Sequence, residues 1–179
     1  MGTASWEDEV GTPTKIEALK ATKVRYAHGR VGKTRVGRDA PSVKAFTWWL
    51  EGAQLGNAVR LAQVELRHDG VCGRCARLLT VPESVDTGFG PHCAAELGVP
   101  WVRDDGSAAK LSDHPVAFIL AGKARFTLTS KKTGQHFTYQ VKKAKDGGKR
   151  PNSPWFVSIL SGPDNGSDYQ YIGCLWEEK

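Results

Sequence analysis

The chain has 179 residues, with 25 Lys and Arg against 19 Asp and Glu, and its formal net charge is +6. This length fits one domain or two small ones, and six tryptophans with 40% hydrophobic residues argue against a disordered chain. The longest apolar run, residues 116–121, is far shorter than the roughly 20 residues of a membrane span. The N-terminal region has no basic stretch followed by an apolar one, so we expect no signal peptide. We therefore expect a soluble, cytoplasmic protein that has no membrane partner.

The positive charge is concentrated in two segments of the chain. Residues 20–38 contain seven basic residues and no acidic one, and residues 123–150 contain nine basic residues and one acidic one. Basic stripes are typical of proteins that bind a polyanion, although two solvated hairpins would have the same composition. The residues predicted to contact nucleic acid are Arg25, Arg30, Lys33, Arg35, Arg38, Lys123, Arg125, Lys131, Lys132, Lys142 and Lys143.

The N-terminal part of the chain contains the main predicted helix. Residues 1–22 are expected to form an acidic leader with a short helix, and residues 23–62 a basic strand followed by the main helix. The strand is predicted at residues 24–26, where apolar and charged residues alternate. The helix is expected to begin after the N-cap candidate Asp39, with Pro41 in its first turn. It ends near Gly52 or Gly56 and has an apolar face formed by Val43, Phe46, Leu50 and Ala53.

The C-terminal part of the chain has the alternation of β-strands. Residues 101–115, rich in Asp, Gly and Ser, are predicted to be a linker, and residues 116–179 an antiparallel β module. Within this module, a hairpin turn at 131–134 precedes strands at 156–160 and 169–176. With the main helix and the cysteines described next, the predicted fold class is α+β: an antiparallel sheet with one main amphipathic helix and a small zinc knuckle.

Three cysteines in residues 63–100 have the spacing of a metal site. Cys72 and Cys75 form a Cys-x2-Cys knuckle, and Cys93 follows after 17 intervening residues. In such a knuckle, two thiolates point at one tetrahedral ion. His68 precedes Cys72 on the incoming strand and is the predicted fourth ligand. We expect a closed, structural Zn2+ site.

Other interpretations of the cysteines stay open. His92 is the alternative fourth ligand, although it is adjacent to Cys93. Cys174 is a third candidate, but in the last strand it would share a face with Ile172 and Trp176, so we expect a small core residue. A disulfide would suit an oxidising compartment, a redox Cys-x2-Cys motif would need a βαβ setting, and a catalytic zinc would need a general base nearby.

No catalytic pattern is complete in this sequence. Residues 27–34 approach a phosphate-binding P-loop, but Ala27 stands where the pattern needs glycine. The His-x-Glu of zinc deaminases is missing as well, because Asp69 and Gly70 follow His68. We therefore expect a protein that is not an enzyme.

Two stretches surround the cysteines: His68-Asp-Gly-Val-Cys72-Gly-Arg-Cys75-Ala-Arg77-Leu-Leu-Thr80-Val-Pro82-Glu-Ser84 and Gly88-Phe-Gly90-Pro91-His-Cys93. Together they resemble a small, largely uncharacterised zinc-knuckle domain found in proteins of bacteriophages and actinobacteria. The resemblance implies a phage-type origin and bound zinc, and it does not supply a function.

Residues 39–46, and a stretch from residues 120–126 to residues 162–165, are also similar to such phage proteins. In those relatives the β part precedes the helix and the knuckle, whereas here it follows them. If the chain is circularly permuted in this way, the strand ending at Trp176 lies beside the strand at 24–26. The two basic segments would then belong to one sheet and form one basic face.

Two functions follow as hypotheses. The first is a small zinc-containing, non-catalytic protein that binds DNA or RNA through its phosphate backbone. The second is a phage-type interaction protein that binds and modulates a host protein, such as a factor that handles nucleic acid.

Overall fold

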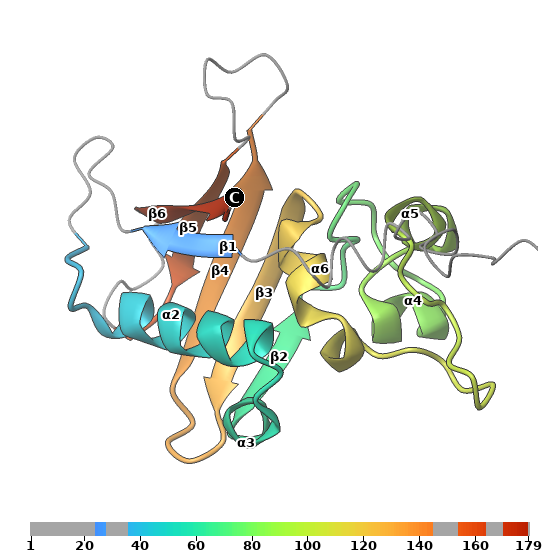
Figure 1. Cartoon of the computed structure of the whole chain (residues 1–179), viewed down its shortest axis with the longest axis horizontal. Coiled ribbons are helices and arrows are strands. Elements are labelled where there is room, and N and C mark those ends of the chain that lie inside the picture. The colour runs from blue at the N-terminus through green and yellow to red at the C-terminus, as the bar shows by residue number, and fades with distance from the viewer. Residues whose placement is uncertain (1–23, 28–35, 145–153, 164–169, 179) are drawn as a thin grey trace, which may run out of the picture.

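The computed structural model describes residues 24–27, 36–144, 154–163 and 170–178. Figure 1 shows a curled sheet of six strands with helix α2 across one face and a group of short helices at one end. The elements in chain order are β1 (Val24–Ala27), α2 (Pro41–Gln54), α3 (Ala58–Ala62), β2 (Val64–His68), α4 (Pro82–Thr87), α5 (Pro91–Leu97), the 3-10 helix η2 (Leu111–Asp113), α6 (Pro115–Leu120), β3 (Lys123–Ser130), β4 (His136–Lys143), β5 (Trp155–Ser161) and β6 (Gln170–Glu177).

The strands form one antiparallel sheet in the order β1-β6-β5-β4-β3-β2. The predicted α+β class with an antiparallel sheet is therefore confirmed. Arg25 lies opposite Trp176, so the prediction that the first described strand lies beside the last is confirmed too. β1 and the β3–β4 hairpin share the sheet, but β6 and β5 lie between them.

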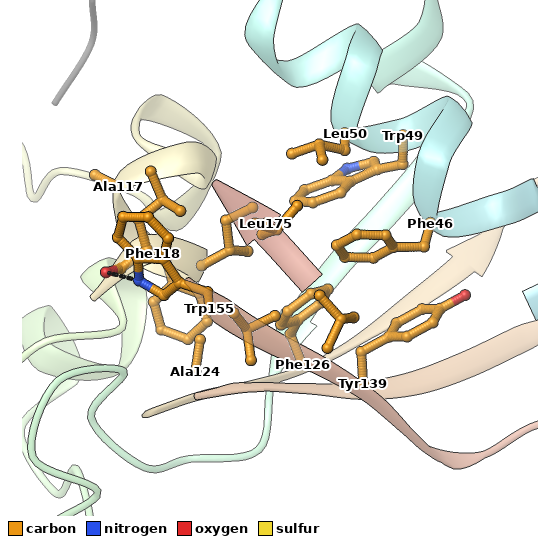
Figure 2. Packing of buried hydrophobic residues seen from close by; sticks show 14 of the residues in the cluster. Phe46, Trp49, Leu50, Ala117, Phe118, Ala124, Phe126, Tyr139, Trp155 and Leu175 are labelled. Atoms are coloured by element: carbon orange, nitrogen blue, oxygen red, sulfur yellow. Dashed lines mark hydrogen bonds between the residues drawn. The ribbon is translucent and has the colours of Figure 1, made fainter. Parts of the chain in front are cut away.

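Helix α2 packs on one face of the sheet, which we call the inner face, and closes the core there. Phe46 lies 5.3 Å from the Tyr139 ring, and Trp49 lies 5.6 Å from the Phe126 ring, between ring centroids (Figure 2). The Tyr139 hydroxyl donates a 2.6 Å hydrogen bond to the carbonyl oxygen of Ser42 at the start of the helix. Each large apolar side chain buried in this way contributes roughly 1.5–3 kcal/mol to folding.

The two ends of α2 lie close to the predicted positions, but the predicted N-cap differs from the observed one. Pro41 is in the first turn, as predicted, but the N-cap is Ala40 and no side chain caps the helix. The predicted N-cap role of Asp39 is therefore wrong; its carboxylate lies 3.6 Å from the Lys44 ammonium instead. The helix ends at Gln54, between the two predicted glycines, and Gly56 takes the positive φ of +62° that glycine tolerates.

The segment predicted as a linker is ordered by its own contacts. Arg103 forms a bidentate ion pair with Asp113, at 2.8 and 2.7 Å. Directly after it, α6 buries Phe118 against Phe126. The carbonyl oxygen of Leu120, the last residue of α6, accepts a hydrogen bond from the Trp155 indole at 2.9 Å (Figure 2). α6 consequently joins this segment to the core of the sheet.

Some sequence-based predictions lie outside the described residues. These are the short helix at 14–21 and the basic residues Arg30, Lys33 and Arg35. Within the described parts of the chain, no helix has the length and apolar character needed to cross a membrane.

Candidate metal centre and basic sheet face

The structure brings the thiol groups of Cys72, Cys75 and Cys93 together, with all three sulfur atoms within 4.8 Å of one another. Around a tetrahedral zinc ion with Zn–S bonds of about 2.3 Å, sulfur atoms lie about 3.8 Å apart. The cluster is therefore compact enough for the three sulfur atoms to face one ion. Cys72 and Cys93 are buried and Cys75 is partly exposed, and these three residues can hold a metal ion.

A tight loop between β2 and α4 determines the positions of the Cys72 and Cys75 thiols. The N–H of Cys72 donates to the Arg77 carbonyl, and the N–H of Ala76 donates back to the Cys72 carbonyl, both at 2.8 Å. Ala76 adopts a φ of +62°, an uncommon conformation for a residue with a side chain. This closed turn directs Cys72 and Cys75 to the same side.

The loop is held to the core by two glycines that flank one aromatic ring. A Cβ atom on Gly73 would lie 2.7 Å from the Phe118 ring, and one on Gly88 would lie 2.8 Å from it. The Gly73 N–H also donates to the Gly88 carbonyl at 3.1 Å. Gly88 ends α4 with a φ of +77°, and Cys93 follows in α5. The fully buried Phe118 thus positions both halves of the cluster.

Hydrogen bonds and burial act on the thiols in opposite directions. Burial raises the pKa of Cys72, but N–H donors from Cys75, Gly90 and Arg74 outweigh it and leave the pKa below its ordinary value. Burial raises the pKa of Cys93 to about 11, although the Arg74 guanidinium, 3.8 Å from its sulfur, opposes the shift. Arg74 also pairs with Glu96 on α5. One basic side chain therefore lies beside the thiolates that a metal would require.

The structure does not bring the predicted fourth ligand, His68, to the sulfur atoms. Its Nε2 lies 2.6 Å from the Val85 carbonyl oxygen, and its Nδ1 accepts a 3.0 Å hydrogen bond from the Gly70 N–H. Both ring nitrogens are thus engaged: Nε2 joins the end of β2 to α4, and Nδ1 contacts the loop that follows β2. In the described residues, the metal-ligand group contains the three cysteines and no histidine or carboxylate.

Neither alternative ligand belongs to the sulfur cluster. The His92 ring is 83% exposed and its Nδ1 is 3.6 Å from the Glu96 carboxylate. Cys174 is buried in β6, opposite Ala27 of β1 and Phe156 of β5. Its prediction as a small buried residue is confirmed.

A cavity of about 650 Å3 opens beside the cysteines. Its wall includes all three cysteines, and the rest is mainly apolar with a few polar groups. The other lining residues include Arg74, Arg77, Leu78, Leu79, Val81 and His92.

On the other side of the sheet from α2, which we call the outer face, basic residues gather on β3 and β4. Lys123 lies directly opposite Lys142 in the register of these strands, and both are exposed. Arg125 follows two residues after Lys123 on the same face, and its guanidinium lies 2.9 Å from the Asp69 carboxylate. Within the described residues, neither lysine forms a salt bridge.

The remaining predicted contact residues are dispersed. Arg25 is on the outer side of the edge strand β1, three strand spacings or about 14 Å from β4 in a flat sheet. Arg38 lies in the turn before α2, and Lys131 and Lys132 lie in the β3–β4 turn. Lys143 places its ammonium 5.2 Å from the Trp155 ring centre on the inner side. The basic face therefore consists of Lys123, Arg125 and Lys142, with Arg25 apart.

The outer face also carries an aromatic residue that was not among the predicted contact residues. Phe156 lies opposite Lys142 on one side and Cys174 on the other, and it is partly exposed. Its ring is 6.2 Å from that of Tyr171. The signal was present in strand alternation, because Trp155 and Val157 on either side of it are core residues.

Among the comparisons with known proteins, one match includes the metal centre. No curated protein and no solved structure is significantly similar to the chain. Residues 64–98 match a family of unknown function (DUF6011), and this segment runs from the first residue of β2 to the C-cap of α5, with all three cysteines inside it.

Proposed function

We propose that the protein binds nucleic acid through the outer face of its sheet, by contacts to the sugar–phosphate backbone and without catalysis. A zinc ion on Cys72, Cys75 and Cys93 serves as a structural element in this proposal. Zinc is the metal that thiolate-rich tetrahedral sites most often hold.

The observation that carries the proposal is the pairing of Lys123 with Lys142. Side chains directly opposite each other in an antiparallel pair have Cβ atoms about 4.5–5.5 Å apart, and like charges there destabilise the sheet. A bound phosphate between the two ammonium groups would remove this repulsion. Arg125, two residues further along β3 on the same face, extends the basic surface, and its guanidinium is paired with the Asp69 carboxylate.

Phe156 adds a second kind of contact beside the lysines. Aromatic rings on a sheet stack with unpaired bases, and each such contact contributes roughly 1–3 kcal/mol. Because Phe156 neighbours Lys142 across the β4–β5 pair, one strand of nucleic acid can place a phosphate on the lysines and a base on the ring. This arrangement favours single-stranded over double-stranded nucleic acid.

A bound metal would stabilise the end of the outer face at which β3 begins. When bound, zinc would join the three cysteines through strong bonds and so stabilise a segment that has little hydrophobic core. The chain's own contribution is to fix the loop of Cys72 and Cys75, whose Gly73 carbonyl accepts a hydrogen bond from the N–H of Lys123 at 2.8 Å.

Fluorescence anisotropy with labelled single-stranded and duplex DNA and RNA at roughly 150 mM salt tests the proposal. We expect binding that weakens as salt rises, with single strands bound more tightly. The double variant Lys123→Ala, Lys142→Ala should bind weakly, whereas the matched control Lys44→Ala, an exposed lysine on α2, should bind normally. Equal binding by both variants would contradict this function.

Protein binding is the second candidate function, and it is favoured by apolar side chains on the metal module. Leu78, Val81 and Val85 are all exposed near the cysteines, and exposed apolar groups of this kind mark interaction sites. A phage-type protein that modulates a host factor would use such a surface. Absence of binding to any nucleic acid, together with capture of one defined host protein that is lost in Leu78→Asp, would favour this function.

A further inference from the structure

We infer that the metal centre is a three-cysteine site whose fourth coordination position faces the cavity and takes an imidazole group from outside the chain. The inference rests on the metal-binding part of the proposed function, and it is independent of nucleic-acid binding.

The first argument is the ligand count. Among the described residues, the ligand group holds three sulfur atoms and no further histidine or carboxylate. The sequence contains five histidines. His68 and His92 lie outside the group, the His114 Nε2–H donates to the Thr87 carbonyl oxygen 2.8 Å away, and His136 lies on β4 opposite Thr129.

One histidine of the chain, His28, lies outside the described residues. Together with His92, which lines the cavity, it is therefore an internal competitor for the fourth position. The experiment below includes it for that reason.

The second argument is access. All three cysteines contribute to the wall of the 650 Å3 cavity, so an incoming side chain can approach the sulfur cluster from this side. A volume of this size lies within the usual range of roughly 300–1,000 Å3 for sites that take small ligands. A closed structural site would be covered by its fourth ligand and the surrounding chain.

The third argument is the chemistry of the wall. Zinc with three thiolates carries one net negative charge, so a neutral nitrogen donor adds no further charge. Arg74, the basic group nearest the sulfur atoms, is already paired with Glu96. Leu78, Leu79 and Val81 provide apolar surface for a ring that has one polar end, as imidazole does. These features favour imidazole over a fourth thiolate, which would double the negative charge.

The test uses the full-length protein with Co2+ in place of zinc, because the visible d–d bands of cobalt report its ligands. We expect added imidazole to change these bands in a saturable way, with one metal retained per chain. Val81→Trp, which places a bulky ring in the cavity wall, should keep the metal and lose the response. A cobalt spectrum that does not respond to imidazole in the unmodified protein would overturn the inference.

Three further variants separate an internal ligand from an external one. His28→Ala, His68→Ala and His92→Ala should each leave the cobalt spectrum as it is before imidazole is added. A changed spectrum in any one of them would assign that histidine to the metal and overturn the inference. Normal nucleic-acid binding with a silent cobalt spectrum would refute this inference alone, whereas absence of nucleic-acid binding with a responsive spectrum would refute the proposed function alone.

Discussion

The backbone N–H of Lys123 donates a 2.8 Å hydrogen bond to the carbonyl oxygen of Gly73. Gly73 lies between the two cysteines of the knuckle, and Lys123 is the first residue of β3 and half of the basic pair on the outer face. The metal loop and the proposed nucleic-acid contact are therefore joined through one backbone hydrogen bond. A structural change at either place should alter the other.

Metal removal should destabilise the protein and weaken its binding to nucleic acid. A ligand that binds the folded state alone stabilises it by about 2.7 kcal/mol at 100 times its Kd, and a chelator removes this term. Cys93→Ser should lose most of its zinc by elemental analysis, whereas the control Cys174→Ser should retain it. Full zinc content in Cys93→Ser would show that the ligand set is different.

Removal of the two outer-face lysines should reduce the salt dependence of binding. Each phosphate contact contributes about 0.7–0.9 to the slope of log K against log salt concentration, so Lys123→Ala, Lys142→Ala should lower the slope by up to about 2. The same variant should unfold at an equal or higher urea concentration, because it removes the like-charge pair. An unchanged slope with measurable binding would place the phosphates elsewhere.

Gly73→Ala should destabilise the chain, since its Cβ would lie 2.7 Å from the fully buried Phe118 ring. Overpacking of this kind typically costs about 1–3 kcal/mol, measurable as a lower free energy of unfolding in urea. Gly37→Ala is the matched control, because nothing lies within 4 Å of a Cβ at that position. Similar losses in both variants would mean that Phe118 moves away at little cost.

His68→Ala should lower stability without removing the metal. The variant breaks the contact with the Val85 carbonyl and leaves the Gly70 N–H without its acceptor, at a cost of about 1–3 kcal/mol. Zinc content measured on the folded variant should stay at one per chain. Loss of zinc at unchanged stability is the result that would make His68 a ligand after all.

The ion pair of Asp113 should make stability depend on acid pH. Burial raises the pKa of Asp113, but the Lys110 N–H and the Arg103 guanidinium outweigh it and hold the pKa below the ordinary value of 3.8. Because the folded pKa is depressed, this contribution is present above about pH 4 and is lost as the pH falls through the folded pKa. Asp113→Asn should therefore be less stable than the unmodified protein at pH 7, and in urea titrations the difference should shrink as the pH falls through the folded pKa of Asp113.

Much of the sheet could be predicted from the sequence because its strands alternate cleanly. Phe126 and Leu128, or Phe137 and Tyr139, are buried at every second position, and the Cys-x2-Cys spacing predicted the sulfur cluster. α6 was missed because six consecutive apolar residues have no helical period. α4 was missed because it is equally short.

The sequence could not show that His68 lies away from the sulfur atoms, because this depends on the direction in which β2 places its ring. The spacing from His68 to Cys72 suits a metal site, but β2 ends at His68 and directs its ring toward α4 and Phe118, 6.0 Å away. Likewise, the total of basic residues in a segment does not reveal which face of a strand each occupies. Lys142 and Lys143 are neighbours in the chain, yet they lie on opposite faces of the sheet.

The pairing of β1 with β6 also has a consequence for synthesis on the ribosome. Val24 pairs with Glu177, so the first described strand lacks this partner until the chain has been synthesised as far as β6. Contacts this distant in sequence close slowly, since a long loop must be ordered before they form. While translation continues, β1 would be an unpaired strand able to join another chain. Pairing with β6 would remove this risk of misassembly.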